Sequence, residues 1–142
     1  MKSATLQLIL VVTLLLLGFE TQAVPVYSRG GVATTAHPLA TKAAVEMYRI
    51  GGNAADAAAA AAFTLAVVEP YSSGIGGGGF ALIRMQKELV FMDFREIAPR
   101  RARREMYVKD GQADPIMSRD GILSAGVPGA VAGYLELQKK YG

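Results

Sequence analysis

Residues 53–80, NAADAAAAAAFTLAVVEPYSSGIGGGGF, decide the fold, because they join an alanine-rich helix to a glycine-rich loop. Asn53 is a good N-cap, and Asp56 in the first turn suits the positive end of a helix. Alanine has the highest helix propensity but buries little area, so we expect this helix to lie inside, close to other backbones. It should end at Glu69, because the residue before a proline disfavours the α region.

The loop that follows has the spacing of a phosphate-binding motif. Gly74, Gly76 and Gly79 form the pattern G-x-G-x-x-G. A dinucleotide-binding loop must follow a strand and open a helix, whose N-terminal amides hold the phosphate. Here a helix precedes the loop and an apparent strand follows it. We therefore expect no phosphate site. The glycines should instead allow positive φ angles or a close backbone approach, which could border a functional site.

Periodicity outward from this stretch predicts the remaining elements. Apolar residues at helical spacing predict an amphipathic helix over about 39–50, which Gly51-Gly52 ends. The runs FALIRM (80–85) and ELVFMDFR (88–95) predict a β-hairpin. Beyond it we expect a short helix at 98–107, a turn-rich loop at 109–121, a strand and turn at 122–129, and a final helix at 130–142. This order predicts a layered α+β or α/β domain.

The N-terminus has the pattern of a secretory signal peptide. Lys2 precedes an apolar run at residues 6–19, and Ala23 is a plausible cleavage point. This run is shorter than the roughly 18–20 residues that span a bilayer, so an uncleaved anchor is the lesser alternative. We therefore expect a leader at 1–23, a periplasmic or secreted protein, and a mature part of residues 24–142.

Composition sets further bounds on the protein. The 142 residues include no cysteine, so the exported chain must be held by its core without disulfides. A net charge of +3 does not by itself indicate a nucleic-acid partner. Because no closing element follows the final helix, we expect the N-terminal piece of a longer protein, with Gly142 as a possible helix cap.

Few other side chains suggest chemistry. His37 is the sole histidine and no cysteine accompanies it, so we expect packing or a local hydrogen bond before Pro38 and no metal site. Ser72 and Ser73 lack a convincing base. Four arginines lie close together, and they could touch nucleic acid or an anionic membrane. A solvated helix face with an Arg101–Glu105 pair is the favoured reading of this cluster, Arg100, Arg101, Arg103 and Arg104.

Three blocks of the sequence together carry a family resemblance. They are AHPLATKAAVEMYRIGGNAADAAAAAAFTLAVVEPYSSGIGGGGFALI, then FMDFREIAPRRA, then SAGVPGAVAGYLELQKKYG. In this order they closely resemble the start of the large subunit of the gamma-glutamyltranspeptidases, or glutathione hydrolases. The resemblance covers about residues 31–142. It implies part of an N-terminal-nucleophile hydrolase fold, a four-layer αββα sandwich that is incomplete in this chain.

The resemblance also implies a mechanism. A precursor cleaves itself into two subunits, and the new N-terminal threonine of the small subunit attacks the γ-glutamyl amide. The N-terminal amine serves as the base. The acyl group then passes to water, an amino acid or a peptide, without a cofactor. We expect no catalytic residue in this chain and no activity from it alone, because Thr34-Thr35 match the start of the family and not its cleavage site.

Arg95 is the site residue that the resemblance assigns, as the arginine that holds the α-carboxylate of the γ-glutamyl donor. A guanidinium fork suits a carboxylate, and lysine does not reproduce that geometry. The strand pattern places Val90, Met92 and Phe94 on one apolar face and Arg95 on the opposite face. From the residues alone, a salt bridge to Asp93 or Glu96 is the alternative.

Three functions follow for comparison. The leading one is a fragment of an exported glutathione hydrolase whose partners are γ-glutamyl compounds and the small subunit, with no nucleic acid. A related acylase, of the cephalosporin or poly-γ-glutamate type, is the second. A non-catalytic exported binding module is the third, and it requires that the chain fold by itself.

Overall fold

The computed structural model of the chain describes residue 28 and residues 30–142. The leader expected at 1–23 lies outside the described residues, as does most of the segment from 24 to 31. Within residue 28 and the stretch from 30 to 142, no helix is long and apolar enough to cross a membrane.

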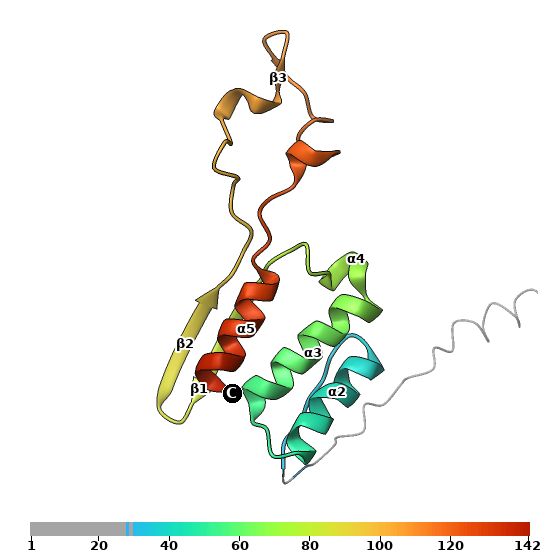
Figure 1. The fold of residues 1–142 in the computed structure, drawn as a ribbon, viewed down its shortest axis with the longest axis vertical. Helices are drawn as coiled ribbons and strands as arrows, with labels where there is room; N and C mark the ends of the chain where they lie inside the picture. Colours follow the sequence, from blue (N-terminus) through green and yellow to red (C-terminus); the bar gives the residue numbers. More distant parts are fainter. Residues whose placement is uncertain (1–27, 29) are drawn as a thin grey trace, which may run out of the picture.

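Three helices form the body of the molecule (Figure 1). They are α2 (Pro38–Arg49), α3 (Ala54–Val68) and α5 (Ala130–Tyr141), and α3 packs against both α2 and α5. All three confirm helices expected from periodicity. Their contacts are made by small side chains, since the buried apolar residues of the described part are seven alanines and Leu137. The close approach expected of the alanine helix is therefore confirmed.

The start of α3 follows its capping sequence. The side-chain oxygen of Asn53 accepts hydrogen bonds from the amides of Ala55 (2.7 Å) and Asp56 (3.3 Å). The Asp56 carboxylate in turn accepts from the Asn53 amide at 3.0 Å, which completes a capping box. The side-chain Nδ2 of Asn53 donates to the Tyr141 carbonyl at 2.6 Å and so ties α3 to the end of α5. Both ends of α3 are as predicted, with Glu69 as its C-cap.

A short helix, α4 (Pro70–Ser73), follows α3 and leads into the glycine loop. The predicted hairpin comes next, with β1 (Phe80–Met85) antiparallel to β2 (Glu88–Asp93). Its register pairs Phe80 with Asp93. Alternate residues of both strands are half-buried, and the other face of the hairpin is exposed and apolar. Helices and an antiparallel hairpin occupy separate segments, so the described part is of the α+β class.

Residues 98–127 form an arm that extends away from the helices (Figure 1). The helix predicted at 98–107 is wrong. This segment holds a turn after Pro99 and the 3-10 helix η1 (Arg104–Tyr107). Only Met106 and Tyr107 of the segment are half-buried and the rest is exposed, so packing contributes little to offset the cost of helix nucleation. The predicted loop contains a small hairpin, β3 (Val108–Lys109) with β4 (Gln112–Ala113).

The strand predicted at 122–129 is also wrong. The segment contains the 3-10 helix η2 (Ile122–Ser124) and a single antiparallel bridge from Val127 to Ile97. Glycine and proline are depleted in strands, and this stretch contains both. The Tyr107 hydroxyl donates to the Leu123 carbonyl at 2.8 Å and joins the two sides of the arm.

Candidate functional site

The candidate site lies where the hairpin ends, one residue beyond β2. The Phe94 amide donates to the Gly79 carbonyl at 3.0 Å, so the strand pairing continues past Asp93. Phe94 faces inward, and its ring packs edge-on against Tyr134 of α5 at a centroid distance of 5.7 Å. Tyr134 packs in the same way on Phe63 of α3, at 5.3 Å. Arg95 therefore lies on the outer face of the hairpin, as the strand pattern predicts.

Glycines from two segments surround the backbone of residues 94–96. A Cβ atom on Gly78 would lie 2.7 Å from the Cα of Arg95, and one on Gly126 would lie 2.9 Å from the Cβ of Glu96. Cβ atoms on Gly129 or Gly133 would overlap Phe94. We call these four glycines the glycine slot. Any side chain at these positions would displace the strand end that carries Arg95.

Two physical needs could explain why the loop at 74–79 is rich in glycine, and the structure distinguishes between them. Glycine can serve a positive φ or a close backbone approach. The glycines of the described part with positive φ are Gly31, Gly51, Gly111 and Gly121, and none of them belongs to this loop. Close approach is therefore the reason that the structure supports for Gly74, Gly78 and Gly79, and Gly78 requires it most. A Cβ on Gly76, by contrast, would have no heavy atom within 4 Å.

The same loop also occupies the N-terminus of α5. The Gly77 carbonyl accepts hydrogen bonds from the amides of Gly129 and Ala130, each at 3.0 Å. Free N-terminal amides of a helix are the groups that hold phosphates in nucleotide-binding loops. Here a backbone carbonyl takes two of them, and the loop precedes strand β1. The geometry thus agrees with the expectation of no phosphate site.

Arg95 makes three contacts near the strand end. Its Nε donates to Oε2 of Glu96 at 2.9 Å, while its backbone amide donates to Oδ1 of Asp93 at 2.9 Å. Its Cζ lies 5.6 Å from the centroid of the Phe80 ring. The salt bridge to Glu96 that the residues alone suggested is present. The side chain remains 59% exposed, so the pair leaves the guanidinium open to a further partner.

The carboxylate of Glu96 is held in its charged form. Its own backbone N–H lowers the pKa of the Glu96 carboxyl most, followed by the Arg95 side chain, and the Gly78 amide adds a smaller effect. Partial desolvation opposes them, and the net result is a lowered pKa. The Glu96 carboxyl is therefore ionised near neutral pH.

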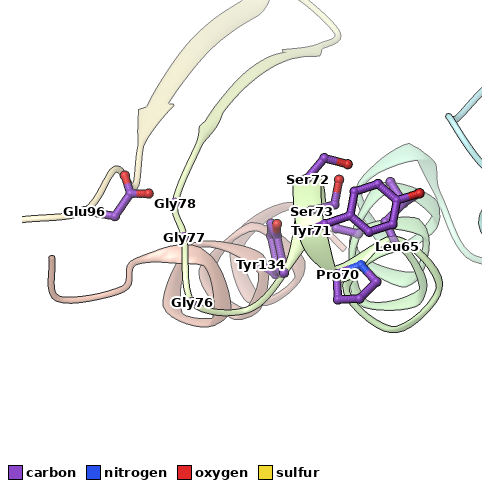
Figure 2. A pocket seen from close by; sticks show the side chains of 12 residues that line it. Leu65, Pro70, Tyr71, Ser72, Ser73, Gly76, Gly77, Gly78, Glu96 and Tyr134 are labelled. Carbon is purple, nitrogen blue, oxygen red and sulfur yellow. The ribbon is translucent and has the colours of Figure 1, made fainter. Parts of the chain in front are cut away.

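A cavity of about 390 Å³ lies beside the glycine loop and is lined by residues 76–78, Glu96 and residues of α4 (Figure 2). Figure 2 shows the loop between Glu96 and α4, with Tyr134 beside it. Ser72 and Ser73 also line this cavity, whereas Arg95 and His37 do not. The serines thus have no histidine base there, in agreement with the sequence analysis.

Residues near the start of α2 have local structural roles. Nδ1 of His37 accepts a hydrogen bond from the Leu39 amide at 3.2 Å, which confirms the expected local bond beside Pro38. Thr35 donates to the His37 carbonyl at 2.8 Å and lies 2.8 Å from the Thr41 hydroxyl. Thr35 is therefore engaged in hydrogen bonds beside the N-cap residue of α2. In the described part, no three His, Cys, Asp or Glu residues group as a metal site would require.

The expected Arg101–Glu105 pair is wrong. The helix that would place these residues one turn apart does not form, since only 104–107 is helical and of the 3-10 type. None of the ion pairs between described residues involves the arginine cluster, and all four arginines are exposed.

Comparison with solved structures defines the class of protein. The gamma-glutamyltranspeptidase of Helicobacter pylori superposes with a TM-score of 0.79 at 47% identity, over 83% of this chain and 35% of that chain. The cephalosporin acylase of Bacillus halodurans gives 0.67 at 33% identity, over 88% and 24% respectively. The chain thus has part of the N-terminal-nucleophile hydrolase fold, as the resemblance implied.

Sequence comparison then gives the family. The family model for gamma-glutamyltranspeptidase matches residues 40–142, and the chain belongs to this family. The glutathione hydrolase proenzyme of Pseudomonas aeruginosa is 43% identical over 114 residues, which cover 80% of this chain and 20% of that relative. The chain therefore spans about a fifth of the length of the curated relatives that it matches.

Sequence reasoning missed two parts of the site. It assigned no role to Phe80, although the hairpin register places this ring diagonally from Arg95. It also did not connect Gly129 and Gly133 with Phe94. Their spacing of four residues puts both on one side of α5, which is a readable signal for a close contact.

Proposed function

We propose that residues 24–142 form the first part of the large subunit of an exported glutathione hydrolase, and that Arg95 binds the α-carboxylate of its γ-glutamyl donor. The observation that carries the proposal is the placement of Arg95. The glycine slot fixes its backbone, and its guanidinium stays exposed on the outer face of the hairpin. Membership of the gamma-glutamyltranspeptidase family supports the substrate class.

The residues of this chain contribute binding and not bond breaking. A guanidinium presents two parallel N–H groups to two carboxylate oxygens, which fixes the donor in orientation as well as position. In the proposed reaction, the threonine of the small subunit attacks the γ-carbonyl carbon and the amine leaves as the γ-glutamyl ester forms. Water or an amino group then attacks the ester and releases the threonine hydroxyl.

The proposed partners follow from the same assignment. Relatives named as glutathione hydrolase proenzymes support glutathione as a donor and a precursor that is cleaved into two subunits. The exposed apolar face of the hairpin, with Phe80, Leu82 and Phe91, offers a surface for the remainder of that precursor. In a complete αββα sandwich, other parts of the precursor would cover this face of the hairpin.

The location is part of the proposal. The apolar leader at residues 1–23 supports export to the periplasm or the medium. N-terminal sequencing of the mature protein tests it directly. A sequence that starts at Val24 is expected, and a retained Met1 in a membrane fraction would contradict the cleaved leader.

The activity test needs a complete enzyme. We define the assay enzyme as the product of the full reading frame or, where that frame ends after Gly142, a chimera. In the chimera, residues 40–142 replace the matching segment of the P. aeruginosa relative. We expect the assay enzyme to hydrolyse a γ-glutamyl anilide. Preference for a glutaryl amide would support the acylase alternative, which the lower identity to the cephalosporin acylase disfavours.

A further inference from the structure

Phe80 is an exposed aromatic residue at the start of β1. It pairs with Asp93 across the hairpin and lies on the outer face, where its ring stacks on Phe91 at a centroid distance of 5.4 Å and an interplanar angle of 26°. Within this chain the side chain is 54% exposed, so burial in the chain does not fix its orientation. The stack on Phe91 gives the ring a defined orientation instead.

The backbone directs the Arg95 guanidinium toward this ring. Phe94 pairs with Gly79, so the residue opposite Arg95 is Gly78, which has no side chain. The next side chain on the outer face of that strand is Phe80, diagonal to Arg95 and within reach of a long side chain. The Cζ of Arg95 lies 5.6 Å from the ring centroid, within the range of a cation–π contact.

Two groups therefore hold the guanidinium from different sides. The ring of Phe80 lies against it, and Oε2 of Glu96 binds Nε. Among the hydrogen bonds between described residues, the Arg95 side chain contributes Nε alone. The Nη groups, which form the terminal pair of the fork, stay available for a carboxylate.

We propose that Phe80 is a positioning residue for carboxylate recognition, whose ring holds the Arg95 guanidinium in the orientation that binds the donor. This inference rests on the proposed function of Arg95. An arginine on a flexible stem loses rotamer freedom when it binds, and a preformed orientation reduces that loss. Phe80 thus favours donors that carry an α-carboxylate over donors that lack one.

The test compares two donors in the assay enzyme. One is the γ-glutamyl anilide, and the other is the 4-aminobutyryl anilide, which lacks the α-carboxylate. The readout is the value of kcat/KM for the γ-glutamyl anilide divided by the value for the 4-aminobutyryl anilide. For Phe80→Leu we expect the ratio to fall about 3- to 30-fold, through a higher KM for the γ-glutamyl donor. Phe80→Tyr keeps a ring and should retain the ratio.

Controls separate positioning from general damage. Leu89→Ala truncates another exposed residue of the outer face, at the far end of the hairpin from Arg95, and should leave the ratio unchanged. Where Phe80→Leu is not processed into subunits, Phe80→Met, which is closer in volume and lacks a ring, replaces it. An equal loss with both donors, or an unchanged ratio in a processed ring-free variant, would overturn the positioning role.

Arg95→Ala distinguishes this inference from the function on which it rests. Collapse of the ratio in Arg95→Ala, together with an unchanged ratio in Phe80→Leu, would overturn the role of Phe80 and leave the proposed function standing. A ratio that survives Arg95→Ala would overturn both.

Discussion

Gly78 lies so close to Arg95 that a Cβ atom on the glycine would be 2.7 Å from the Cα of the arginine. This contact joins the loop that precedes β1 to the second residue beyond β2. It explains why a loop with phosphate-loop spacing lies beside a carboxylate-binding candidate. The glycine makes room for the strand end that carries Arg95.

Replacement of Gly78 by alanine should therefore disturb the strand end. The added Cβ meets backbone atoms of Phe94 and Arg95, which cannot rotate away as a side chain could. We expect the Gly78→Ala variant of the assay enzyme to lose about 1–3 kcal/mol of stability, the usual range for overpacking. Urea denaturation and the processed fraction of precursor measure the effect.

Gly76 provides the matched control for that variant. A Cβ there has no heavy atom within 4 Å, and the φ of Gly76 is not in the left-handed region. Gly76→Ala should therefore leave both stability and processing near those of the parent. Equal behaviour of the two variants would mean that close packing at Gly78 does not matter.

Gly133→Ala should change stability in the direction opposite to the one that helix propensity predicts. Gly133 lies within α5, where alanine is favoured over glycine by about 1 kcal/mol. A Cβ on Gly133 would, however, overlap the ring of Phe94. We expect Gly133→Ala to lower the unfolding midpoint of the assay enzyme. Phe94→Ala removes the Cγ and Cδ2 atoms of the overlap, so the losses from the two substitutions should be less than additive in the double variant. Stabilisation by Gly133→Ala alone would contradict the contact.

The Arg95–Glu96 pair predicts a pH dependence. The pKa of the Glu96 carboxyl is lowered in the fold, chiefly by its own backbone N–H and then by Arg95. Its stabilising contribution is therefore complete above the ordinary glutamate pKa and is lost as the pH falls through the lowered value. The stability difference between the parent and Glu96→Gln should persist at mildly acidic pH and shrink below the ordinary glutamate pKa. A difference that vanishes above that pKa would contradict the assignment.

Much of this architecture was predictable because local patterns and tertiary contacts agree in it. The capping sequence at Asn53, the alternation in β1 and β2, and the Pro70 stop each act within a few residues, and the structure confirms all three. The outward direction of Arg95 follows from the same alternation, since a strand places successive side chains on opposite faces. These parts needed no knowledge of distant contacts.

The arm could not be predicted in the same way. Residues 98–107 contain residues with good helix propensity, yet only Met106 and Tyr107 among them are half-buried, so packing contributes little to helix formation. The glycine slot could not be predicted from the sequence for a different reason. Gly78 and Gly129 converge on Phe94 from positions far apart in the chain, and one sequence does not state which distant backbones meet.

The small core predicts the behaviour of this chain by itself. Among the described residues the buried apolar side chains are those of seven alanines and Leu137, whereas Phe80, Leu82 and Phe91 remain exposed on the hairpin. Burial of one large apolar side chain contributes about 1.5–3 kcal/mol, and here the large side chains lack cover. We expect residues 24–142 to show no cooperative thermal transition by circular dichroism and to bind an apolar dye. A single sharp transition would favour the independent binding module instead.

The kinetics of Arg95→Lys in the assay enzyme test the central claim most directly. Lysine keeps the positive charge but loses the fork that pairs with both carboxylate oxygens. We predict that KM for the γ-glutamyl anilide rises about 10- to 100-fold while kcat changes little, as expected for lost donor binding. A KM within about twofold of the parent value, in a variant that is processed normally, would contradict the assignment of Arg95 to the α-carboxylate.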